Sequence, residues 1–390
     1  MIHETPDVSV VRADAHVRAC AGFSVPVGTA SDDQAAIQEL NAHLTHWGLQ
    51  TRVRRRQEKA PKGQRHRFFL DLRGISQELT TELDTAALTR ELATANADGR
   101  TSVEAEIWLA WLVSPGLLEF PSFAELFAQF RIRCAIVDAA SRTLVDFHAH
   151  AVNRPVSHWT YIEDVGFRLN AGKSLLEGLR LALHPETPEK RYAFSCYRAS
   201  EYVVLLGLAA EAERSNPALY EGIEAQWLQG PLMAARFEAA FLSPLGTAKR
   251  PLPKRWYVPG DRVWFRNPEP ISGDVAGYEG SFVLYLGRGH FGNFWKLDKP
   301  FTIEDKLYEI YCWRFGVCTR EGEEAWIDDD LVDQAVAEAK KCPQQMAQII
   351  DEMYRYRDPY PEINGGGAID YQREVPRFVL PGSCNVTLPK

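Results

Sequence analysis

The sequence predicts an α+β fold in which a cysteine-bearing helix packs on an antiparallel sheet, next to an additional N-terminal α/β or α+β domain. Residues 198–212 have the length and composition of one long helix, directly after a short extended segment that ends at Cys196. Three later segments are rich in β-branched and aromatic residues and predict strands, at residues 256–258, 262–265 and 281–286. Helix and strand signals that follow one another in separate runs are typical of α+β proteins.

Composition narrows the class of protein. The 390 residues suggest two or three domains, and 45% hydrophobic with 25% charged residues is ordinary globular usage. The longest apolar runs are much shorter than the roughly 20 residues of a membrane helix. No basic segment followed by an apolar core opens the chain, so we expect a cytoplasmic protein, or one exported without a cleaved signal peptide. The net charge of −8 argues against nucleic-acid binding driven by overall charge.

The first hundred residues predict a separate small unit. Residues 22–27 favour a strand, 35–47 a helix, and 49–56 and 67–72 two further strands. The stretch 52–67 is strongly basic, which is compatible with an anionic partner such as nucleic acid or lipid headgroups. We favour a solvated loop with a Pro-Lys-Gly turn, because no aromatic residues alternate with the charges.

The remaining helices and strands define three regions. Helices are expected near residues 101–113, 121–140, 173–183 and 331–341, a strand at 312–317, and an extended tail from residue 358. We therefore divide the chain into an N-terminal α+β accessory domain (1–115), a catalytic domain (116–325) and a C-terminal helix with an extended tail (326–390).

Cys196 is the cysteine whose position indicates chemistry. The seven cysteines are scattered, odd in number and without a CxxC pair, so neither a zinc site nor a disulfide scaffold is expected. Backbone N–H groups and the helix dipole at the start of a helix favour the thiolate form. Papain-like enzymes place their nucleophile in this way, and their base is a histidine on a later strand. Of ten histidines only His290 follows Cys196, and this order is that of the NlpC/P60 branch.

Residues 120–315 resemble the bacterial spore-coat type of protein-glutamine gamma-glutamyltransferase, a compact transglutaminase with an NlpC/P60-like, papain-like core. The similar pieces occur in the family's order. They are a Phe-Pro-Ser-Phe helix start (residues 120–133), a Trp followed by Gly-Phe-Arg-Leu (159–169) and the Tyr-Ala-Phe-Ser-Cys nucleophile motif (190–196). A Pro-Gly-Asp strand with an Asn-Pro turn (259–268) and a strand ending in Tyr-Leu-Gly (280–287) follow.

The resemblance implies a catalytic cysteine, glutamate and histidine. Cys196 matches residue for residue. The family's glutamate position holds Ser281 here, and Glu279 lies two residues earlier, where a strand would turn it to the same face. The family's histidine position holds Asn293, and His290 lies just before it. We therefore take Cys196, His290 and Glu279 as the catalytic candidates.

Ser281, Asn293 and Trp159 are candidates for binding substrate or orienting the catalytic groups. The implied reaction is acyl transfer through a thioester, from a protein glutamine to a lysine amine or to water. The resemblance implies no metal or organic cofactor. Partners would be proteins that present glutamine and lysine, with no nucleic acid and no membrane span.

Two alternatives stay open at this point. The chain could be an NlpC/P60-like amidase or peptidase, or a catalytically inactive family member that acts as a binding module. The length of the N-terminal extension also suggests that residues 1–115 select a partner or deliver the enzyme, as in a bacterial effector.

Overall fold

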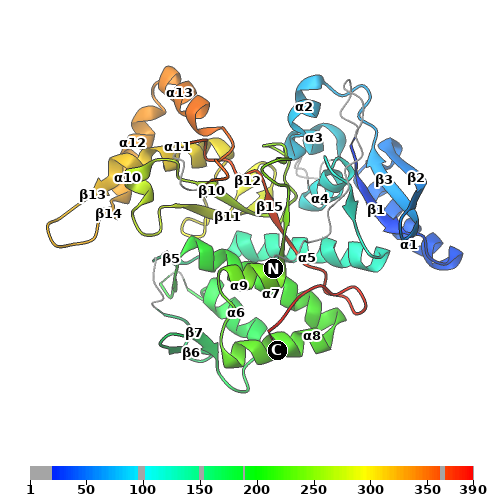
Figure 1. The fold of residues 1–390 in the computed structure, drawn as a ribbon, viewed down its shortest axis with the longest axis horizontal. Helices are drawn as coiled ribbons and strands as arrows, with labels where there is room; N and C mark the ends of the chain where they lie inside the picture. The colour runs from blue at the N-terminus through cyan, green and yellow to red at the C-terminus, as the bar shows by residue number, and fades with distance from the viewer. Residues whose placement is uncertain (1–19, 95–101, 149–152, 188, 361–364, 390) are drawn as a thin grey trace.

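An N-terminal sheet and its helices form one lobe of the molecule (Figure 1). The computed structural model describes residues 20–94, 102–148, 153–187, 189–360 and 365–389. The sheet has the order β2-β3-β1-β4, with β1 antiparallel to β3 and parallel to β4. Its strands are β1 (Phe23–Pro26), β2 (Val53–Ala60), β3 (Gly63–Leu70) and β4 (Leu118–Glu119). The helices of this lobe are α1 (Ala30–His46), η1 (Gln50–Arg52), α2 (Gln77–Glu82), α3 (Thr85–Leu92) and α4 (Val103–Leu112).

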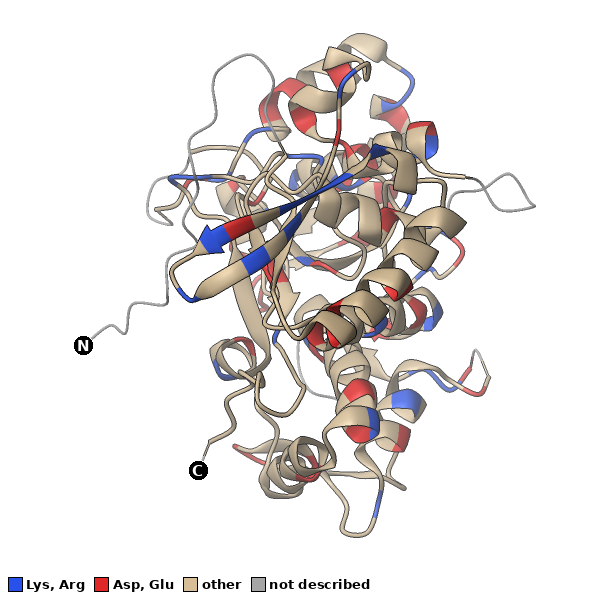
Figure 2. Cartoon of the chain, turned by 90° about the vertical axis from the view of Figure 1, so that its right-hand side faces the viewer, with Lys and Arg blue, Asp and Glu red and all other residues tan. Residues whose placement is uncertain are grey.

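The basic stretch is a β-hairpin, so the expectation of a loop was wrong. β2 and β3 pair from Val53 with Leu70 to Ala60 with Gly63, and only Pro61 and Lys62 form the turn. The hairpin forms because β3 turns Phe68 and Leu70 into the core, while β2 is exposed along most of its length. Figure 2 shows Lys and Arg on both strands, in accord with a solvated surface.

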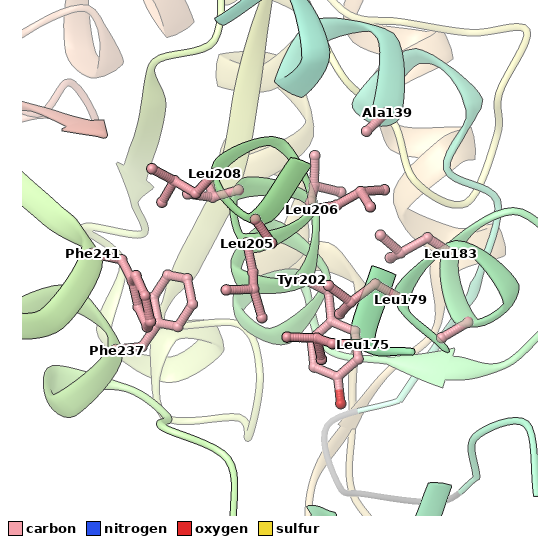
Figure 3. Packing of buried hydrophobic residues seen from close by; sticks show 14 of the residues in the cluster. Ala139, Leu175, Leu179, Leu183, Tyr202, Leu205, Leu206, Leu208, Phe237 and Phe241 are labelled. Atoms are coloured by element: carbon pink, nitrogen blue, oxygen red, sulfur yellow. The ribbon is translucent and has the colours of Figure 1, made fainter. Parts of the chain in front are cut away.

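A second layer consists of helices around α7 (Cys196–Ser215). They are α5 (Phe123–Arg142), α6 (Leu175–Leu183), α8 (Pro217–Gln229) and α9 (Ala235–Phe241). Short strands join them, β5 (Asp146–Phe147) parallel to β8 (Ala193–Phe194), and β6 (Trp159–Ile162) antiparallel to β7 (Gly166–Leu169). α7 is apolar on nearly all sides and lies at the centre of this layer, as its labelled leucines and Tyr202 show in Figure 3. Gly207 lets α5 approach closely, because a Cβ there would lie 2.6 Å from Ile136.

The third layer is a five-stranded sheet with the order β12-β11-β10-β15-β9. Its strands are all antiparallel to their neighbours: β9 (Leu242–Leu245), β10 (Arg262–Arg266), β11 (Gly280–Gly287), β12 (His290–Phe291) and β15 (Arg373–Pro376). Leu284 of β11 packs in the apolar cluster of α7, so the cysteine-bearing helix lies against this sheet. The molecule is thus α+β.

The opposite face of the sheet carries the C-terminal helices. Val283 and Tyr285 pack there with α11 (Ile303–Gly316), α12 (Asp329–Ala339) and α13 (Pro343–Met353). The smaller elements are α10 (Pro270–Gly273), β13 (Val317–Cys318) and β14 (Trp326–Ile327).

Two local predictions were wrong, and the tail that was expected to be extended contains a strand of the sheet. Residues 312–316 belong to helix α11, where Cys312 is buried on its inner face, and only Val317 and Cys318 form a strand. Residues 256–258 form no strand; Trp256 is instead anchored by its indole N–H, which donates to the carbonyl of Ala110 at 3.1 Å. The tail supplies β15, which pairs with both β10 and β9 and so lies inside the sheet.

The N-terminal lobe and the helical layer share one apolar core. Trp108 of α4 stacks on Phe130 of α5 with ring centres 4.8 Å apart, and Phe123 and Phe127 pack in the same cluster. A division of the chain at residue 115 into independent domains stays a prediction. Among the described residues, no helix combines the length and the apolar character needed to cross a bilayer.

Candidate active site

Cys196 is the first residue of α7, as the order of elements predicts. Strand β8 leads into it, and β8 is held by parallel pairing with β5. The Ser195 hydroxyl caps the helix by accepting from the backbone N–H of Arg198 at 3.3 Å. The chain therefore changes from strand to helix at the thiol, and the backbone N–H of Tyr197 in the first turn points to the sulfur.

The thiol is not activated by its surroundings. Burial raises the pKa of Cys196 above its ordinary value, more than the backbone N–H of Phe282, the Lys306 ammonium, the backbone N–H of Tyr197 and the Arg262 guanidinium lower it. The expectation that the helix start favours the thiolate is not met. The free-energy cost of removing a charged sulfur from water is larger than the stabilisation that those groups give to the thiolate. The resting group is a neutral thiol, and its reaction requires a base.

A cavity of about 530 Å³ opens on the thiol. We call it the cysteine pocket; its lining residues are Ser195, Cys196, Tyr197, Trp264, Ala276, Gly277, Glu279, Gly280 and Phe282. Glu279 lies just before β11, exposed to solvent, and its carboxylate accepts from the N–H of Gly277 at 3.4 Å. The structure thus brings two of the three catalytic candidates, Cys196 and Glu279, to one cavity.

Gly280 keeps the wall of this pocket thin. A Cβ at this position would lie 2.4 Å from the indole nitrogen of Trp264 and 2.5 Å from the carbonyl oxygen of Phe265. Only glycine lets β10 and β11 come together here, next to Glu279.

The structure does not bring His290 to Cys196. His290 pairs with Gly287 at the far end of β11, whereas Phe282 is the strand residue beside the thiol. Five residues of strand span roughly 16 Å. The two-residue turn formed by Arg288 and Gly289, both at positive φ, places His290 directly opposite Gly287. His290 lines a different cavity, together with Asp84, Arg255 and Glu304.

The three remaining candidates make contacts that support the fold. Trp159 is buried, and its indole N–H donates to the carbonyl of Gly178 at 3.0 Å. Ser281 is buried, and strand alternation places it on the face opposite Phe282. Asn293 holds the turn after β12, since its side-chain oxygen accepts from the backbone N–H groups of Trp295 and Lys296. None of the three lines the cysteine pocket.

A buried arginine behind the pocket was missed from the sequence. The Arg262 guanidinium donates to Ser200 at 2.9 Å and to Glu238 at 3.1 Å, and it also pairs with Glu374. The guanidinium carbon of Arg262 lies 3.8 Å from the ring centre of Phe282, which lines the pocket.

The same network fixes Tyr197, whose hydroxyl donates to Glu238 at 2.6 Å. One cation thus positions two walls of the cysteine pocket. The signal in the sequence was an arginine directly before the apolar run Val-Trp-Phe of residues 263–265.

Comparison with known families decides the class of protein. The model of the family described as protein-glutamine gamma-glutamyltransferase matches residues 84–364. The chain belongs to this family. The protein is therefore an acyltransferase that acts on protein glutamine side chains, and the general property of the family is a thioester intermediate.

Among solved structures, the transglutaminase from Geobacillus stearothermophilus without its C-terminal extension is similar to the chain. It is 16% identical, with 55% of this chain and 98% of that chain covered and a TM-score of 0.38. A comparison with curated proteins finds no match. The family match begins before the expected catalytic boundary and ends beyond α13, so it includes α4 and the C-terminal helices.

Proposed function

We propose that Cys196 is the nucleophile of this transglutaminase and that Glu279 is its general base, in a core of the papain-like NlpC/P60 type. The observation that supports this is the cysteine pocket, which Cys196 and Glu279 line together while His290 lines another cavity. A raised thiol pKa requires a base within the pocket, and Glu279 is the carboxylate that lines it.

The reaction follows from this geometry. Glu279 takes the thiol proton as the sulfur attacks the carboxamide carbon of a substrate glutamine. Backbone N–H groups of the first turn of α7 stabilise the oxyanion. The protonated Glu279 then gives its proton to the amide nitrogen of the tetrahedral intermediate, the C–N bond breaks, ammonia leaves, and a thioester remains. An amine or water attacks the thioester with Glu279 again as base, and gives an isopeptide bond or glutamate with release of the thiol.

Ammonia release from a glutamine-containing protein tests the assignment. Cys196→Ala should abolish release, and Glu279→Gln should lower kcat/KM by about 100-fold or more, the usual loss when a general base is removed. His290→Ala should stay within about twofold of the parent enzyme. Cys384→Ala, in the exposed tail, is the matched cysteine control.

The assignment fails if His290→Ala removes activity and Glu279→Gln retains it. Full activity of Cys196→Ala would sink the cysteine mechanism itself. Release measured with and without an added amine separates cross-linking from deamidation. A folded parent enzyme with no release on any glutamine or cell-wall amide would favour the binding-module alternative. Selection of a partner by residues 1–115, as in an effector, belongs to the same proposal.

A further inference from the structure

A second cavity also borders the segment that carries Cys196. It has a volume of about 570 Å³ and shares Ser195 and Tyr197, the two neighbours of Cys196, with the cysteine pocket. We call it the arginine pocket after Arg154, which lines it together with the aromatic rings of Phe167, Phe194 and Tyr202. The two cavities are therefore neighbours along the segment that carries Cys196.

Arg154 is a buried cation without an acidic partner. Its side chain is about 5% exposed, and among the described residues no carboxylate lies within ion-pair distance of it. The guanidinium donates from Nη1 to the carbonyls of Asn153 at 2.5 Å and Ala193 at 2.7 Å. Its Nε atom has no hydrogen-bond partner. A buried charge in this state is costly, and an anion entering the pocket would compensate it.

Aromatic rings hold the guanidinium in place. Its carbon lies 3.3 Å from the ring centre of Phe194 and 4.8 Å from that of Phe167. These faces attract a cation and restrict its motion, but they do not neutralise its charge. The rings thus fix the planar guanidinium, whose Nη1 is engaged by two carbonyls and whose Nε is unpaired, and Tyr202 also forms a side-chain hydrogen bond with it.

The two acidic residues that line the pocket do not neutralise the charge of Arg154. Glu201 is already engaged, since it pairs with Arg198 and accepts from the backbone N–H of Ala234 at 2.7 Å. Asp164 is exposed at the turn between β6 and β7. Neither forms an ion pair with Arg154.

The distance to the nucleophile is that of a short peptide. Arg154 holds the carbonyl of Ala193, and Ala193 precedes Cys196 by three residues of extended chain, roughly 10 Å. A group that reaches Arg154 would therefore belong to a residue two or three positions from the reactive glutamine.

We propose that the arginine pocket binds a carboxylate of the acyl-donor substrate, two or three residues from its reactive glutamine, with the apolar stem of that residue against the aromatic rings. This inference rests on the proposed function of Cys196. The carboxylate can come from an acidic side chain or from the end of a peptide chain.

Calorimetric titration of the full-length Cys196→Ala variant tests binding without turnover. The probes are capped heptapeptides with one central glutamine, and Glu, Asn or Phe at each position two or three residues away. A further peptide ends in a free carboxylate at that distance. We expect at least one Glu peptide to bind about tenfold tighter than its Asn counterpart. Preference for the free terminus instead would assign the second source.

Arg154→Met in the same background should abolish this preference, and Arg154→Lys should retain part of it. Arg168→Met, on exposed β7, should leave it unchanged and serves as the matched control. Equal binding of Glu and Asn peptides, tightest binding of the Phe peptide, or a preference that survives Arg154→Met would overturn the inference. If Arg154→Met does not fold, the inference is still decided by the peptide series measured on Cys196→Ala with Arg154 in place, and by the same series on Arg154→Lys.

These outcomes are separable from the proposed function. Loss of the nucleophile assignment would show in ammonia release by Cys196→Ala, whereas the carboxylate preference is measured in a variant that cannot react. One result can therefore fail without the other.

Discussion

At the residue scale, Cys196 combines a reactive position with an unreactive protonation state. It begins a helix and lines a cavity, yet burial keeps its pKa above the ordinary value of 9.0. A thiol of this kind reacts with a substrate only when a base and the substrate are both in place. The raised pKa lowers the thiolate fraction of the resting thiol, and the thiolate is the form that reacts with small oxidants and alkylating agents.

Alkylation of the resting enzyme tests this state. Because the pKa of the thiol is raised in the folded protein, its thiolate fraction at neutral pH is smaller than that of an ordinary cysteine. The rate of alkylation at Cys196 should therefore still be rising with pH at pH 9. We expect iodoacetamide, followed at each cysteine by mass spectrometry, to label Cys196 at pH 7.5 no faster than an unstructured cysteine peptide. A rate that levels off below pH 8 would contradict the neutral thiol.

Two of the three catalytic candidates from the sequence line the cysteine pocket, and the third lies at another cavity for a definable reason. Cys196 followed from a helix start, which is a local feature. Glu279 was chosen as if it lay in the strand with Ser281, but the strand begins at Gly280, and Glu279 reaches the pocket from the preceding loop. His290 depended on the shape of a two-residue turn, and that geometry is fixed by positive φ angles which sequence order does not reveal.

At the element scale, one buried carboxylate joins α4 to the β11–β12 turn. Glu106 of α4 accepts from the backbone N–H of Arg288 at 2.6 Å and from the hydroxyl of Tyr285. Burial raises the pKa of Glu106 to about 7. The bond ties the N-terminal lobe to the strand that passes the cysteine pocket, and its charge state depends on pH near neutrality.

Unfolding measurements should detect this carboxylate. Its folded pKa lies above the unfolded one, so its contribution to stability is full below about pH 4.5 and is lost as the pH rises through about 7. Glu106→Gln keeps one of the two acceptor oxygens and cannot ionise. Between pH 5 and 7.5, urea denaturation should show a smaller loss of unfolding free energy in the variant than in the parent, by about 1–3 kcal/mol.

Glu104→Gln, on the exposed side of the same helix, is the control for this measurement. Identical pH profiles of the parent and Glu106→Gln would show that Glu106 ionises as an ordinary surface glutamate.

The elements with strong local signals were predictable, and those defined by distant partners were not. α7, β10 and β11 followed from their length and residue types, whereas the basic hairpin was mistaken for a loop because its charges hide the alternation of Phe68 and Leu70. β15 was unpredictable in a tail rich in Pro and Gly. It is a strand because Arg373 to Pro376 find partners in β9 and β10.

At the scale of the whole molecule, the N-terminal lobe completes the core of the catalytic region. Trp108 stacks on Phe130, and the indole of Trp256 donates to Ala110 of α4. These contacts bury large aromatic side chains, each of which contributes on the order of 2–3 kcal/mol when removed from water. The lobe therefore stabilises the catalytic region, in addition to any role in the selection of a partner.

A chain of residues 116–390 tests this point. Removal of the lobe would expose Phe123, Phe127 and Phe130, and Trp256 would lose its hydrogen-bond acceptor. We expect aggregation in size-exclusion chromatography or a weak near-ultraviolet circular dichroism spectrum, with ammonia release lost as well. A monomeric, active shortened enzyme would instead establish residues 1–115 as an independent domain, and would count against a role for it in catalysis.

The insertion of β15 between β9 and β10 affects the time at which the enzyme becomes active during its synthesis. Glu374 on this strand is one of the acids that neutralise Arg262, the cation behind the cysteine pocket. Chains fold from the N-terminus as they are made, but this sheet stays open until β15, which follows β11 and the helices α11 to α13, has been made. A chain synthesised only as far as β11 thus holds Cys196 next to an incomplete sheet and leaves Arg262 without Glu374.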